Sequence, residues 1–175
     1  AIECGTWKDK KIFQKKLMKG KNSGAYFTFN TSIDKDIIYQ IAISFVSIEN
    51  AKENLRSEKQ FADFDFCKNE TQKIWDKNLS KIIIKSNSKD KLTQFYTHLY
   101  HSMIHPNIVS DINGEYMGAD YNIKRVEKGR DHYSSFSVWD TYRTQGQLVA
   151  ILFPKESSDM MESLVNFAKE AGGYG

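Results

Sequence analysis

The chain has 175 residues, of which 40% are hydrophobic and 27% are charged, and its formal net charge is +3. This composition is too apolar for an intrinsically disordered protein, and the length allows one ordinary domain or two small ones. No apolar run approaches the roughly 20 residues that a membrane-spanning helix needs, so we predict no membrane span.

The N-terminal region carries the densest basic cluster, with seven lysines between Lys8 and Lys21. A nucleic-acid groove needs clustered basic residues interleaved with aromatic ones, whereas lysine and acidic residues are interspersed over this chain as a whole. We therefore predict that the cluster is the solvated face of a surface segment, and we predict no nucleic-acid partner.

Two segments rich in β-branched and aromatic residues, 24–30 and 37–46, flank a polar turn at 31–36. Their partly alternating pattern predicts two antiparallel strands of a sheet with one buried face.

Two helices are predicted next. Ser47 is a candidate N-cap for a helix over 48–60, whose apolar positions are thinly spaced, so we expect this helix to be mostly exposed. A second helix is predicted over 65–78, and a short strand over 81–85. The residues expected on the inner face of the second helix are Phe66, Ile74 and Trp75.

A polar break at residues 87–90 changes the character of the chain. We place a domain boundary near residue 87, between domains 1–86 and 87–175. From Leu92 the apolar spacing is helical, and Pro106 ends the helix that we predict over 92–105.

Three histidines, His98, His101 and His105, fall on one face of this helix. Histidines at such a spacing can converge on one zinc ion, but no Cys, Asp or Glu lies near enough in the sequence to complete the ligand set. We favour a polar face that lines a cavity or the solvent.

Residues 107–135 show no sustained apolar period, which predicts a long loop of functional importance, with a small hairpin around Asn113 and Gly114. Asp111 and Asn113 superficially resemble the start of a calcium loop. The remaining oxygen ligands of such a loop are missing, so we favour a turn.

Helices are predicted at 139–152 and 154–171, the second with Pro154 at its first position and Gly172 as its terminator. The residues expected on the inner face of the second helix are Met160, Met161, Leu164 and Phe167.

The stretch 136–143 places an aromatic ring, a carboxylate, a hydroxyl and a guanidinium close together. A sugar ring stacks its apolar face on an aromatic side chain, and its hydroxyls bind carboxylate and guanidinium groups. Trp139, Asp140 and Arg143 are therefore candidate sugar-binding residues. The structural alternative is a buried Trp139 beside a helix N-terminus, with Asp140 on the helix dipole and Arg143 as its partner.

Several segments follow one another in an order and spacing typical of one family. They are FYTHLYH at 95–101, SDINGEY at 110–116, FSVWDTYR at 136–143, DMMESL at 159–164 after Pro154, and GGYG at 172–175. Together they closely resemble the glycoside hydrolase family 92 α-mannosidases. ISFVS at 43–47, followed by Asn54, Leu55 and Glu58, extends the resemblance to about residues 24–175.

The resemblance implies an α+β fold. The end of an N-terminal β-sandwich with linker helices would occupy residues 1–86, and the first helices of an (α/α)6 toroid would occupy residues 87–175. It also implies removal of terminal mannose from α-mannosides, with α-1,2 linkage expected and α-1,3, α-1,4 and phosphodiester-linked mannose left open.

The implied mechanism is inverting, with a general acid and a general base about 6.5–9.5 Å apart. No motif in this chain matches either carboxylate, so we assign no catalytic residue and expect the isolated chain to be inactive. Trp139, Asp140 and Arg143 are the implied substrate-binding residues.

The resemblance further implies calcium as cofactor, with ligands outside this chain, mannose-containing glycans as partners, and a periplasmic or extracellular location. Cys4 and Cys67 are either one disulfide or two small buried side chains. Two other classes of function stay open: a non-catalytic carbohydrate-binding module, and a structural or interaction protein.

Overall fold

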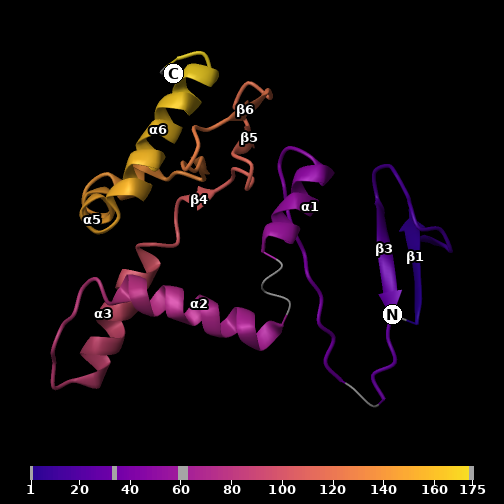
Figure 1. Cartoon of the computed structure of the whole chain (residues 1–175), viewed down its shortest axis with the longest axis horizontal. Helices are drawn as coiled ribbons and strands as arrows, with labels where there is room; N and C mark the ends of the chain where they lie inside the picture. The colour runs from indigo at the N-terminus through magenta and orange to yellow at the C-terminus, as the bar shows by residue number, and fades with distance from the viewer. Residues whose placement is uncertain (1, 33–34, 59–62, 174–175) are drawn as a thin grey trace. The chain divides into compact units, whose positions relative to one another are not determined.

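A computed structural model of the chain describes residues 2–32, 35–58 and 63–173. Contacts group the chain into two compact units, Ala1–Gln40 and Ile41–Gly175 (Figure 1). The domain boundary that we place near residue 87 falls within the second unit and stays a prediction. No helix in the described ranges is long and apolar enough to cross a membrane.

Parts of three expectations lie outside the described residues. They are residues 33–34 of the predicted turn, residues 59–60 of the predicted helix 48–60, and the final Tyr174 and Gly175.

The first unit is a three-stranded antiparallel sheet in the order β2-β1-β3. Its strands are β1 (Glu3–Lys8), β2 (Lys11–Phe13) and β3 (Ser23–Thr28). Asp9 and Lys10 connect β1 to β2 with φ values of 46° and 68°, the positive values that a tight two-residue hairpin turn requires. The predicted strand 24–30 is thus confirmed as β3, but its partner is β1.

The predicted pairing of residues 24–30 with 37–46 is wrong. The described residues from 35 to 46 form no strand, and Ile41, Ile43 and Phe45 are exposed. An alternating apolar pattern predicts which faces a strand would bury, but a strand forms only where another strand supplies hydrogen-bonding partners. The same reason applies to residues 81–85, where the predicted strand is also absent.

The second unit begins with helices whose starts follow from their capping residues. They are α1 (Ile48–Ser57), α2 (Phe64–Leu79) and α3 (Lys89–His101), with N-caps Ser47, Asp63 and Ser88. Each cap side chain accepts a hydrogen bond from a backbone N–H of the first turn, which otherwise has no partner within the helix. All three predicted helices are present, but α3 begins three residues earlier and ends four residues earlier than the predicted 92–105, so Pro106 does not end it.

The predicted inner face of α2 is only partly correct. Trp75 stacks edge-on against Tyr100 of α3, with ring centroids 4.6 Å apart. Phe66 and Ile74 are exposed instead of buried.

The segment expected to be one long loop contains four short strands in two antiparallel pairs. β4 (Asn107–Ile108) pairs with β7 (Tyr133–Ser134), and β5 (Glu115–Met117) pairs with β6 (Ile123–Arg125). Gly114 has a φ of 84° and closes a turn that precedes β5, so the turn at Asn113 and Gly114 does not join the two hairpin strands.

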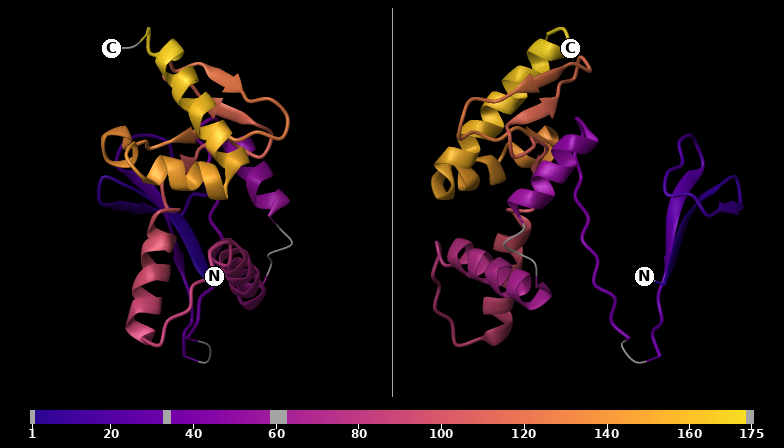
Figure 2. Two further views of the ribbon diagram at one scale, coloured as in Figure 1. Left: turned by 90° about the vertical axis from the view of Figure 1, so that its left-hand side faces the viewer. Right: turned by 45° about the vertical axis from the view of Figure 1, so that its right-hand side comes forward.

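The C-terminal part contains α4 (Val138–Thr141), α5 (Gln145–Leu152) and α6 (Pro154–Glu170). The single helix predicted over 139–152 is therefore broken at residues 142–144. Figure 2 shows α6 beside β5 and β6, and α5 packs on the start of α6.

The core of this part differs from the prediction for α6. Asp159 and Ser163 are its buried residues, whereas Met161 and Phe167 are exposed. The reason is β7: the backbone N–H of Tyr133 donates to Ser163 Oγ over 2.9 Å, so the inner face of α6 must carry polar acceptors. The buried apolar residues are Leu99, Tyr116, Tyr133, Val149 and Phe153.

Candidate functional site

The predicted sugar-binding residues lie on and just after α4, and all three are exposed. Trp139 is 87% exposed, which contradicts the alternative in which it is buried. Ser137 Oγ donates a hydrogen bond to Asp140 Oδ2, and Arg143 Nε donates to Tyr142 Oη over 2.7 Å. Among the described residues no ion pair joins Asp140 to Arg143. The segment thus presents a ring, a carboxylate and a guanidinium to solvent.

A mostly apolar hollow of about 490 Å³ lies beside this segment. Its apolar lining includes Phe136, Val138, Val149, Met160 and Leu164. Thr141 and Tyr142 also line it, so α4 contributes to both the hollow and the exposed segment. The arrangement suits a ligand with one apolar face and several hydroxyl groups.

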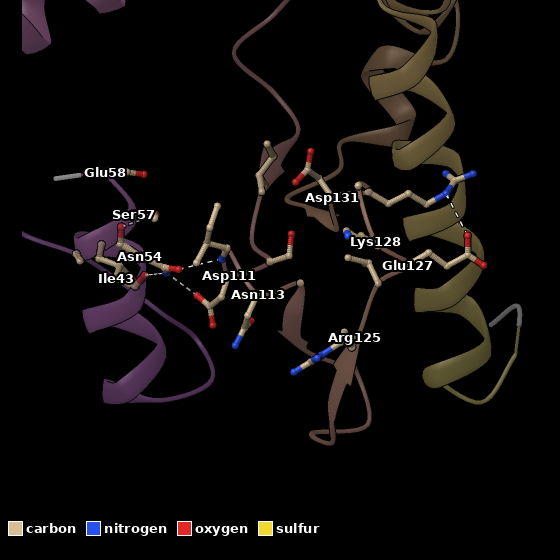
Figure 3. A pocket seen from close by; sticks show the side chains of 18 of the residues that line it. Ile43, Asn54, Ser57, Glu58, Asp111, Asn113, Arg125, Glu127, Lys128 and Asp131 are labelled. Carbon is tan, nitrogen blue, oxygen red and sulfur yellow. Dashed lines mark hydrogen bonds and ion pairs between the residues drawn. The ribbon is translucent and has the colours of Figure 1, made fainter. Parts of the chain in front are cut away.

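A larger open hollow of about 1060 Å³ lies between α1, the turn before β5 and the segment after β6 (Figure 3). Asp111 sits on its wall and is only 6% exposed. Figure 3 shows Asn54 reaching from α1 toward Asp111. A buried carboxylate needs hydrogen-bond donors, because removing its charge from water is costly.

Three neutral side chains supply those donors. Asn54 Nδ2 lies 2.7 Å from Asp111 Oδ1, while Ser44 Oγ and Asn50 Nδ2 lie 2.7 and 2.8 Å from Oδ2. Asn50 and Asn54 are four residues apart on α1 and so point to the same side of the helix. Asn54 Oδ1 also accepts from the backbone N–H of Ile112 at 2.9 Å. Asp111 therefore fastens α1 and the segment before it to the turn that leads into β5.

Glu115 continues the same network. Asn50 Nδ2 donates to its Oε2 over 2.9 Å, and Arg125 Nη2 lies 2.8 Å from its Oε1. The hydrogen bond from Asn50, followed by the one from Arg125, holds the pKa of Glu115 below its usual range.

A second buried carboxylate, Asp159 on α6, binds two cationic side chains. Arg130 Nη1 lies 2.7 Å from Oδ1 and Lys155 Nζ lies 3.0 Å from Oδ2. Burial alone raises the pKa of Asp159, but the hydrogen bonds from Lys155, the Asp131 backbone and Arg130 outweigh it and lower the pKa. This cluster ties the segment before β7 to α6.

A third buried cluster contains Tyr116 and His132, whose rings stack with centroids 3.6 Å apart and planes 13° from parallel. Tyr116 Oη donates to Glu170 Oε1 over 2.9 Å. Burial, followed by this hydrogen bond, raises the pKa of Tyr116, and burial lowers the pKa of His132. His132 Nδ1 is buried and has no hydrogen-bond partner among the residues that the structure describes.

The described residues do not form a cluster suited to a metal ion. His98, His101 and His105 are exposed. Asp111 and Glu115 do not fit calcium, because their oxygens face N–H and O–H donors that would repel a cation.

The sequence identified the exposed 139–143 segment but missed the network around Asp111. A signal was present: α1 has few apolar positions, yet carries Asn50 and Asn54 at a four-residue spacing. A helix that packs through polar side chains has this pattern, and Asp111 is the acceptor that it requires.

A sequence model described as the glycosyl hydrolase family 92 catalytic domain matches residues 50–174. No curated protein matches the chain.

Three solved structures of glycoside hydrolase family 92 enzymes are similar to this chain. The GH92 family glycosyl hydrolase ccman5 is 25% identical with a TM-score of 0.79, over 96% of this chain and 22% of that one. The GH92 α-mannosidase BT3965 from Bacteroides thetaiotaomicron is 26% identical with a TM-score of 0.75, over 95% of this chain and 23% of that one. BT3965 in complex with mannoimidazole gives 26% identity and a TM-score of 0.75, over 95% and 22% of the two chains. The chain thus spans less than a quarter of the length of these structures.

Proposed function

We propose, because this chain belongs to glycosyl hydrolase family 92, that the enzyme of which it forms part removes terminal mannose from α-mannosides. The substrate class is suggested by two similarities, to an α-mannosidase and to its complex with mannoimidazole. We further propose α-1,2 specificity and inversion at the anomeric carbon.

The observation that carries the proposal is the exposed segment after Ser137. Trp139, Asp140 and Arg143 lie within five consecutive positions, and each is exposed to solvent, where a ligand can reach it. We propose that Trp139 stacks on the apolar face of the terminal mannose, that Asp140 accepts hydrogen bonds from its hydroxyl groups, and that Arg143 donates hydrogen bonds to them. These contacts orient the sugar and do not transfer a proton.

Hydrolysis with inversion also needs a general acid for the leaving oxygen and a base that activates water. We propose that both carboxylates, and the ligands of the calcium ion that the family leads us to expect, belong to parts of the enzyme outside these 175 residues. Among the described residues, the buried carboxylates Asp111 and Asp159 each accept hydrogen bonds from three donors. These donors occupy the positions around the carboxylate oxygens that a substrate or a water molecule would need.

The same premise supports a proposal about architecture. We propose that residues 1–86 end a β-sandwich with linker helices, and that residues 87–175 begin an (α/α)6 toroid. Export to the periplasm or the cell surface is part of this proposal, since its substrates are glycans.

One pair of measurements tests the function. Binding of mannose and α-1,2-mannobiose is measured by calorimetry on this chain and on the full-length gene product, and release of mannose is measured on both. We expect the full-length protein to bind and to release mannose. Binding without release by the full-length protein would indicate a carbohydrate-binding module, and neither activity would indicate a structural protein.

A further inference from the structure

Gln145, the first residue of α5, lies two residues after Arg143 and bonds to a distant part of the chain. Its side-chain Nε2 lies 2.9 Å from the carbonyl oxygen of Ser102 and 3.2 Å from that of His105. One side-chain amide therefore uses both of its hydrogens on two carbonyls just past the C-terminal end of α3.

Ser102 is the C-cap of α3, and His105 lies four residues beyond the end of the helix. The last carbonyl groups of a helix have no partner within it, and in the described part of the chain no backbone N–H bonds to the carbonyl of Ser102 or His105. Gln145 thus satisfies two backbone acceptors and at the same time ties α5 to α3. A residue with only one donor, or with none, cannot make both bonds.

The position of this link between α5 and α3 matters because the helical structure is interrupted directly before Gln145. Residues 142–144 separate α4 from α5, and Thr144, the N-cap of α5, makes no side-chain capping bond. No continuous helix therefore fixes the orientation of the segment that carries Trp139 and Arg143. Gln145 is the first residue after this interruption, and its side chain bonds to the end of α3. Gln147 Nε2 adds a local bond to the carbonyl oxygen of Tyr142 at 3.0 Å.

We propose that Gln145 is a positioning residue that fixes the sugar-binding segment 139–143 against the end of α3. In this proposal Gln145, whose side-chain donors are already used on the two carbonyls, acts through Asp140 and Arg143. The link to sugar binding rests on the proposed function, whereas the link to the backbone of 139–143 does not.

Three variants distinguish the effect of the two Gln145 hydrogen bonds from the effect of the size of its side chain. Gln145→Glu keeps the size but replaces the donors with a carboxylate that faces two carbonyl oxygens. Gln145→Lys keeps enough N–H donors for both carbonyls, and its positive charge suits the C-terminal end of α3. Gln94→Glu, on the exposed side of α3, is the matched control.

The first measurement is backbone hydrogen exchange on the 175-residue chain. We expect Gln145→Glu to speed exchange of the 140–142 amides, which bond to the carbonyls of Ser137 and Val138, about tenfold, while exchange in β5 and β6 stays the same. Gln145→Lys should restore slow exchange, and the control should leave it unchanged. Unchanged exchange in Gln145→Glu, or faster exchange throughout the second unit, would overturn the positioning role.

The second measurement is a double-mutant cycle on the full-length enzyme. We expect Gln145→Glu to lower kcat/KM for an α-mannoside about tenfold, mainly through KM, and to have a clearly smaller effect once Asp140→Ala is present, because only the route through Arg143 is then left. Full additivity of the two changes would overturn the proposed action through Asp140. If Asp140→Ala alone leaves kcat/KM normal, the sugar-binding role of the segment is refuted, and hydrogen exchange still decides whether Gln145 positions it.

Discussion

At the scale of the single residue, Asp140 is the most direct test of the proposed sugar site. Its carboxylate is exposed and receives one hydrogen bond, from Ser137, so it has acceptor capacity left for a ligand. In the assembled enzyme, loss of a charged hydrogen bond to a sugar hydroxyl costs about 1.5–3 kcal/mol. We expect Asp140→Ala to lower kcat/KM by about 10- to 100-fold, measured by mannose release from a disaccharide. A variant that folds normally and keeps normal kinetics would show that Asp140 does not bind the sugar and only accepts the hydrogen bond from Ser137.

Asp111 gives the contrasting case of a carboxylate with a structural role. In Asp111→Asn, one carboxylate oxygen becomes an N–H2 group that faces side-chain donors from Ser44 and Asn50, or from Asn54. A buried donor without an acceptor costs about 1–3 kcal/mol. We expect the free energy of unfolding, measured by urea denaturation of the chain, to fall by that amount.

The matched control for this change is Asp76→Asn on the exposed side of α2. It alters the net charge by the same unit but leaves no buried donor unpaired. Equal stabilities of the two variants would mean that the Asp111 network contributes nothing beyond its charge.

At the scale of secondary-structure elements, the attachment of α6 to the segment before β7 depends on ionised Asp159. Its folded-state pKa is lowered, so the carboxylate contributes stability that is fully present above its ordinary pKa of 3.8 and is lost as the pH falls through the lower, folded-state value. We expect the free energy of unfolding to decline below about pH 4. Asp159→Asn should flatten this decline in urea denaturation at several pH values, and an unchanged pH profile would refute the assignment.

The helices were predictable to a greater extent than the strands, for a physical reason. Ser47 and Ser88 cap helices through bonds to residues only three positions away, and Pro154 fixes the start of α6 by its own ring. Strands at 37–46 and 81–85 would require partners remote in the sequence, which a local apolar pattern does not identify. The break at 142–144 was missed because the apolar spacing continues through it.

In the candidate site, too, local features were predictable from the sequence and long-range contacts were not. Trp139, Asp140 and Arg143 were found because they are neighbours in the sequence. The Asp111 network was missed because Ser44 and Asn54 meet Asp111 only after the chain folds. Gln145 belongs to this second class, since its partners lie about 40 residues before it.

At the scale of the whole molecule, α5 and α6 expose large apolar side chains, as we expect if the proposed toroid continues with further helical hairpins. Ile151 on α5 is 78% exposed, and Met161 and Phe167 on α6 are 54% and 58% exposed. In an (α/α)6 toroid each helical hairpin buries such side chains against the next one. The proposed acid, base and calcium ligands would arrive with those further hairpins.

We therefore expect the 175-residue chain by itself not to hydrolyse mannosides. Trp139, Asp140 and Arg143 can hold a sugar, but holding it does not stabilise the oxocarbenium-like transition state unless a general acid and an activated water are positioned on either side of the bond. The purified chain is assayed against an aryl α-mannoside and α-1,2-mannobiose, with calcium and with a chelator, beside the full-length enzyme as the positive control. Release at the rate of a blank is the expected result. Calcium-dependent release well above the blank would mean that both carboxylates lie within these residues, and that the segment is misplaced within the proposed toroid.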